Sequence, residues 1–330
     1  MKKVILYFLL LVLLVTVFIT CKQKKNTLTL DVTSLQHLCV KRLTDVIVYD
    51  IFSPPVASRI YAYSNLAFYE AVRFKDSSSN SLVTQLKGFN EIPQPEKNKQ
   101  YNYTLAAIKS FFNVAKALTF SKDSLRKTES QLLNEFENAT DEAVFRNSIA
   151  FGDTIAAVIL KRAAADNYKK TRGMAKYSVF KETGKWQQTP PDYADAIEPN
   201  WRLIKPMLLD SASQFKPTPP PPFDLNKNSR YYKELMETYT VSKQLSLSQD
   251  TIAHYWDDNP FVTEHEGHLM FATKKTTPGG HWMGIISILC KQTNTDVVKT
   301  ARAYALTSCA IFDGFISCWN EKYRDRKSVV

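Results

Sequence analysis

The sequence has little glycine and none of the glycine-rich motifs that mark common nucleotide or ester chemistry. Nine glycines occur in 330 residues, well below the average usage of about 7%. It contains no Gly-x-Ser-x-Gly and no glycine-rich phosphate loop, so nothing points to a serine hydrolase or a P-loop enzyme. Long segments rich in Ala, Leu, Lys and Glu recur instead, which predicts an all-α, multi-helix bundle.

The chain also lacks a basic block interleaved with aromatic residues. Its formal net charge is +11, but the cations are spread over predicted helix surfaces. This distribution argues against nucleic acid as a partner. A positive field of this kind attracts small anionic substrates.

Cysteine is scarce, with five in the whole chain. Cys309 and Cys318 lie on one predicted helix, too far apart to bridge. Cys39 and Cys290 either pair in an oxidising compartment or serve as small core residues.

The N-terminus carries Lys2 and Lys3, an apolar run over residues 4–19, and then Cys21. A short apolar run after a basic start is typical of a secretion signal, with a membrane anchor as the alternative. Cys21 at its end resembles the site of a bacterial lipoprotein signal. We therefore expect a signal peptide at 1–20, a lipid-anchored tether at 21–28, and an exported helical domain at 29–330 that faces the periplasm or the cell surface.

Apolar spacing predicts the helices of that domain. The expected ranges are Ser34–Phe52, Val56–Phe74, Tyr101–Leu118, Ser124–Asn138, Asp141–Asn167, Ser229–Lys243, Ser248–Asp257 and His281–Lys291, followed by a closing helix capped by Asn294 or Thr295. Pro54 and Pro55 are expected to end the first of these. Between 169 and 223, prolines interleaved with tryptophans predict a long irregular excursion that packs over the bundle.

Four of the five histidines cluster between His254 and His281, among acidic residues. Imidazole and carboxylate together suit zinc, iron or nickel. However, the spacing of His265 and His268 is not the helical pair of a zinc protease. We predict a polar surface loop and no metal site.

The closing helix carries a lysine on its predicted inner face. Its apolar stripe is Ile311, Phe312, Phe315, Cys318 and Trp319, whereas Asp313, Ser317, Asn320 and Arg324 follow a polar face. Counting on from Phe315 by two turns places Lys322 over the apolar stripe. Such a lysine either holds an oxyanion, such as phosphate or vanadate, or extends to water or pairs with a carboxylate.

Several segments together resemble the vanadium-dependent haloperoxidase and type 2 phosphatidic acid phosphatase superfamily. These are Pro54–Tyr63, Ala67–Ala71, Trp256-Asp-Asp-Asn-Pro260, Pro278-Gly-Gly-His-Trp282, Asp313 and Trp319-Asn-Glu-Lys-Tyr323. The resemblance covers most of residues 30–330 and corresponds to the N-terminal two-thirds of such proteins.

The resemblance assigns Lys322 to the lysine that opens the first active-site motif of the superfamily, and so to both a catalytic and a cofactor-binding role. It implies a bound vanadate and peroxide-dependent halide oxidation, or no cofactor and phosphoester hydrolysis. The Arg-Pro expected beyond Lys322 and the motifs Pro-Ser-Gly-His and Ser-Arg-x-x-x-Gly-x-His are missing. We therefore expect the front part of such a fold, inactive as this chain. The alternative is a non-catalytic surface lipoprotein that binds a partner or ligand.

Overall fold

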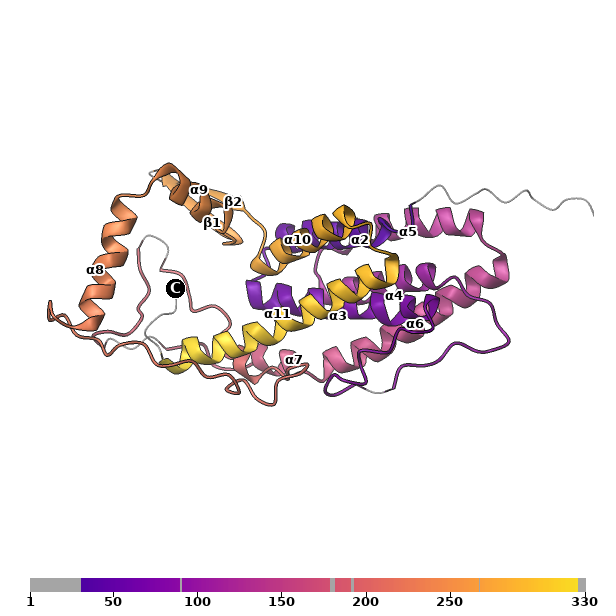
Figure 1. Cartoon of the computed structure of the whole chain (residues 1–330), viewed down its shortest axis with the longest axis horizontal. Coiled ribbons are helices and arrows are strands. Elements are labelled where there is room, and N and C mark those ends of the chain that lie inside the picture. Colours follow the sequence, from indigo (N-terminus) through magenta and orange to yellow (C-terminus); the bar gives the residue numbers. More distant parts are fainter. Residues whose placement is uncertain (1–30, 90, 179–181, 191–192, 267, 326–330) are drawn as a thin grey trace, which may run out of the picture.

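The computed structural model describes residues 31–325, except 90, 179–181, 191–192 and 267 (Figure 1). It is predominantly helical, as the sequence predicted. The helices are α2 (Leu35–Tyr49), α3 (Pro54–Val72), α4 (Tyr103–Leu118), α5 (Lys122–Ala139), α6 (Glu142–Ala164), α7 (Tyr168–Arg172), α8 (Arg230–Lys243), α9 (Leu247–Tyr255), α10 (Pro278–Gln292) and α11 (Val297–Asp325), with 3-10 turns η1 (Arg73–Lys75) and η2 (Trp201–Leu203). The expected helix ranges differ from these by a few residues at their ends.

Helix α3 is the centre of the bundle, and nearly all of its residues are buried. It packs against α11, α4 and α6 (Figure 1). Pro54 and Pro55 occupy the first positions of α3, where a missing N–H costs nothing because those amides have no partner within the helix. The prolines therefore begin the second helix. The first helix ends earlier, at Tyr49.

A buried ion pair joins α3 to the end of α6. The Arg59 Nε donates to the Asp166 carboxylate at 2.7 Å, and both side chains are almost fully buried. The Tyr63 hydroxyl donates to the same carboxylate at 3.0 Å. Arg162 extends the network, because its guanidinium donates to Tyr63 and to the backbone oxygens of Lys205 and Pro206. These bonds attach the proline-rich segment to the bundle.

The proline-rich excursion is irregular, as expected, and packs on α11 through a few buried side chains. Trp201 is fully buried and meets Phe312 edge to face, with ring centroids 6.4 Å apart. Near the end of α11, the Trp319 indole and the Tyr323 hydroxyl both donate to the carbonyl of Ile197. The excursion thus forms one wall beside α11.

Residues 224–275 form an arm that projects from the bundle (Figure 1). It contains α8, α9 and an antiparallel hairpin of β1 (Phe261–Glu266) and β2 (Leu269–Lys274). Neither α8 nor α9 buries a residue. The hairpin was not predicted, since the segment around His265 was expected to be a loop.

Three further expectations need correction or comment. Asp296 caps α11 in place of Asn294 or Thr295, because its carboxylate accepts from the amides of Val298 and Lys299 at 3.0 Å. Cys39 and Cys290 are free, buried thiols and form no disulfide. Within the described part, α6 is long and apolar enough to cross a bilayer by length and composition, but it packs against α4 and α3.

Candidate functional site

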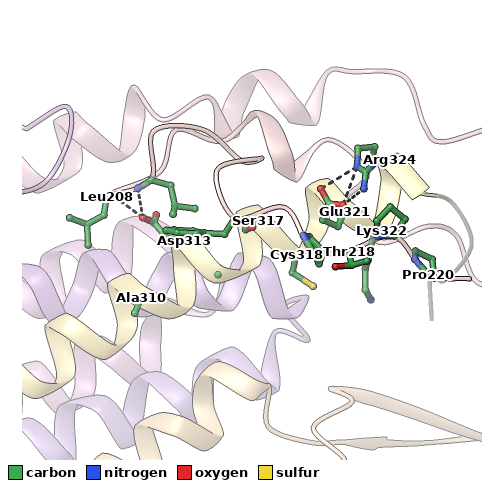
Figure 2. Close-up of a pocket in the computed structure, with 15 residues that line it drawn as sticks. Leu208, Thr218, Pro220, Ala310, Asp313, Ser317, Cys318, Glu321, Lys322 and Arg324 are labelled. Carbon is green, nitrogen blue, oxygen red and sulfur yellow. Dashed lines mark hydrogen bonds and ion pairs between the residues drawn. The ribbon is translucent and has the colours of Figure 1, made fainter.

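A cavity of about 960 Å³ lies between α11 and the segment 208–220 of the excursion (Figure 2). On the α11 side it is lined at helical spacing by small and polar residues. These are Ala310, Asp313, Gly314, Ser317, Cys318, Glu321, Lys322 and Arg324. Leu208, Phe215 and three prolines form much of the opposite wall. The wall is therefore largely apolar, with charged groups gathered toward the C-terminal end of α11.

In the C-terminal part of α11, the large buried apolar residues are Phe312, Ile316, Trp319 and Tyr323, which recur at helical spacing. The predicted stripe is thus wrong in part. Cys318, assigned to the apolar face, is exposed and lines the cavity. Asp313 and Asn320, assigned to the polar face, are buried. The Asp313 carboxylate is buried because backbone amides from a distant segment donate to it.

Lys322 lies on the cavity side of α11, adjacent to the buried face, and is half-buried. Its Nζ stands 4.6 Å from the centre of the Trp319 ring, a distance at which the ring face attracts a cation. Trp319 in turn meets Phe315 with ring centroids 5.1 Å apart. The geometry places a partly desolvated cation at the edge of a cavity. Its role in catalysis and in cofactor binding stays a prediction.

Asp313 lies at the other end of the cavity. Its structural role was not predicted from the sequence. Its carboxylate accepts from the backbone amides of Met207, Leu208 and Leu209, at 2.7, 2.7 and 3.0 Å. The position of Asp313 beside Leu208 is seen in Figure 2. Three N–H donors satisfy a buried carboxylate well. Asp313 therefore holds the excursion against α11 and sets the width of the cavity. Sequence spacing alone could not show this, because the three amides lie far from Asp313 along the chain.

Glu321 and Arg324 form an ion pair on the same stretch of α11 (Figure 2). The Arg324 Nε donates to the Glu321 carboxylate at 3.0 Å. This hydrogen bond, together with the charge of Arg324, lowers the pKa of Glu321. Lys322 lies between these two residues in the sequence and lines the same cavity.

The histidine cluster does not assemble a metal site within the described residues. The His281 Nδ1 lies 2.9 and 3.1 Å from the two Asp258 oxygens, and the Trp256 ring stacks on the imidazole at 4.8 Å. His254 faces Asp250 at 3.6 Å. Among the side chains that the structure describes, no three His, Cys, Asp or Glu groups come together as metal ligands do. The side chain of His265 lies outside that description.

Cys21, the predicted lipidation site, also lies outside the described residues. The same holds for the expected signal peptide at 1–20 and for the tether at 21–28. These assignments remain predictions.

Comparison with known proteins gives the family. No family description and no curated protein matches the chain. Among solved structures, the chain is similar to the crystal structure of the first bacterial vanadium-dependent iodoperoxidase, with 42% sequence identity and a TM-score of 0.83. The match covers 91% of this chain and 72% of that protein. With this identity over most of both chains, in a helical fold whose last helix carries Lys322 beside a cavity, the chain belongs to the vanadium-dependent haloperoxidase family.

Proposed function

We propose that this protein contributes Lys322 to an oxyanion site of the haloperoxidase type and that the site serves peroxide-dependent halide oxidation. One observation carries the proposal: a half-buried lysine on the last helix borders a 960 Å³ cavity in a chain 42% identical to a vanadium-dependent iodoperoxidase. A fixed ammonium in a largely apolar setting stabilises negative oxygen far better than the same group in water.

The described residues fit an oxyanion only in part. Lys322 supplies a charge-assisted donor, and the Trp319 ring limits where its ammonium can move. No histidine lies among the described residues that line this cavity, although imidazole is the group that the family resemblance requires for attack or coordination. The residues that line this cavity therefore account for binding of an oxyanion and for no catalytic step. Lys322 binds and orients the anion, and Asp313 keeps the cavity open by holding its far wall.

Two assays test the proposal. The protein as its gene encodes it should oxidise iodide with hydrogen peroxide only after vanadate is added. The polypeptide 21–330 alone should show no such turnover and no hydrolysis of a phosphomonoester, because its sequence lacks the histidine motifs, whose removal abolishes a step outright. Iodide oxidation without vanadate in the first assay, or turnover by residues 21–330 in the second, would contradict the proposal.

We further propose that the protein is exported and anchored to a bacterial membrane through lipid on Cys21. The apolar run that ends at Cys21 supports this. Metabolic labelling with palmitate should give a labelled band, and Cys21→Ser should abolish the label and leave unprocessed precursor. A matched control is Cys318→Ser, which changes an exposed thiol outside the signal and should leave labelling unchanged. Labelling that survives Cys21→Ser would refute lipid attachment at this site.

A further inference from the structure

A second cavity, of about 590 Å³, lies between α2, α10 and α11 and shares no lining residue with the Lys322 cavity. Its size is within the range of small-molecule sites. Apolar side chains line much of it, including Leu38 and Val40 from α2 and Met283 from α10. Lysine, histidine, tyrosine and serine residues also reach its wall. The cavity thus combines an apolar body with a few polar groups, as ligand sites do.

A glycine in the middle of α10 keeps this cavity open. Gly284 lines it and is exposed, and a Cβ added there would meet no other atom within 4 Å. Glycine inside a helix weakens the helix, because it loses more conformational freedom on folding than other residues do. The unfilled space above Gly284 is therefore a place where a ligand can lie against α10.

The polar wall offers a hydrogen-bond donor. His37 is 7% exposed, and its Nδ1 lies 2.7 Å from the Tyr304 hydroxyl. Burial raises the pKa of Tyr304, with a hydrogen bond from Ser287 acting the other way. A Tyr304 hydroxyl that donates to His37 Nδ1 places the imidazole proton on Nε2. That N–H makes no hydrogen bond with the residues that the structure describes.

The local charge is positive. Lys291 lines the same cavity and forms no ion pair or hydrogen bond with any described residue. Burial, and then the charge of Lys291, lower the pKa of His37, while Asp31 acts in the opposite direction. The Asp31 carboxylate is already hydrogen-bonded by Thr33. Lys41, also on the wall, pairs with Asp45 at 3.1 Å. Lys291 is exposed, and it is the lysine of this wall that has no carboxylate partner among the described residues.

We propose that this cavity binds a small monocarboxylate with an aryl or alkyl tail. The carboxylate lies between the Lys291 ammonium and the His37 Nε2, and the tail lies over Gly284 against Met283 and Leu38. Opposite charge, a buried donor and an apolar body select this ligand class over a neutral molecule of the same shape. This site is separate from the oxyanion site proposed above and does not depend on it.

The test compares 3-phenylpropionate with 3-phenylpropan-1-ol, which share a tail and differ in charge. Calorimetric titration of the full chain in detergent, corrected with a detergent blank, should show the acid binding at least about tenfold more tightly. Lys291→Gln should remove most of that difference and leave the affinity of the alcohol unchanged. The matched control is Lys299→Gln on α11, an exposed lysine that does not line the cavity and should change neither affinity.

Gly284→Leu separates binding from folding. A Cβ at position 284 meets no other atom within 4 Å, and leucine has a higher helix propensity than glycine. The melting temperature should therefore hold or rise, while both probes should lose about tenfold or more in affinity. Equal affinities of the acid and the alcohol would overturn the proposal. So would an acid preference that survives Lys291→Gln, or binding that survives Gly284→Leu.

Discussion

The bundle and the arm show how differently the same kinds of side chain behave in two parts of one molecule. In the bundle, Arg59 and Asp166 pair at 2.7 Å with 5% and 0% of their side chains exposed. In the arm, Arg230 and Glu234 pair at 2.6 Å with 80% and 49% exposed. The distances are alike, yet the energetic consequences differ, because removing one partner strands a charge only where water cannot reach it.

The largest expected effect breaks the buried pair. Asp166→Ala leaves Arg59 buried without its counter-ion, and should lower the free energy of unfolding by about 3–5 kcal/mol in urea denaturation. The matched change in the arm, Glu234→Ala, removes an exposed partner four residues along the helix. It should change the free energy of unfolding by less than about 0.5 kcal/mol. Similar losses in the two variants would show that the arm is packed as firmly as the bundle.

A smaller effect compares helix caps in the two regions. Asp296→Ala removes the side-chain cap of α11 and should cost about 1 kcal/mol of unfolding free energy, since α11 packs on the central α3. Ser246→Ala removes the capping box of α9, which buries no residue, and should loosen α9 without shifting the main unfolding transition. Hydrogen exchange of α9 amides would detect that local change.

The same cap predicts a pH dependence. Burial acts to raise the pKa of Asp296, but hydrogen bonds from Lys299 and its charge outweigh burial, and the pKa is lowered below 3.8. A carboxyl with a lowered folded pKa stabilises the fold above its unfolded value and loses that contribution as the pH falls through the folded value. The difference in unfolding free energy between wild type and Asp296→Ala should therefore persist above the unfolded pKa and close as the pH falls through the lower, folded pKa. Asp296→Asn keeps an oxygen acceptor but has no titrating group. Its unfolding free energy should therefore differ less from that of wild type, and the variant should lack this pH dependence.

Much of the bundle could be predicted from sequence because its helices are long, periodic and flanked by prolines or caps. The arm was harder. The hairpin at 261–274 contains charged and histidine residues and lacks the regular alternation of apolar and polar residues that marks a strand. The local sequence pattern therefore favoured a loop. At the cavity, spacing assigned Lys322 to the site, which stays a prediction. Spacing misplaced Cys318 and missed the burial of Asp313, because the amides that donate to the Asp313 carboxylate come from residues 207–209.

The proposed function rests on Lys322, and the most direct test is its contribution to oxyanion affinity. In the protein as its gene encodes it, titration with orthovanadate should show that Lys322→Ala weakens binding by about 1.5–3 kcal/mol, the range of a charge-assisted hydrogen bond. This corresponds to about ten- to hundredfold in the dissociation constant. Lys299→Ala, on the exposed side of the same helix, serves as the control and should have no effect. An unchanged vanadate affinity in Lys322→Ala would contradict the assignment of this lysine to the oxyanion site.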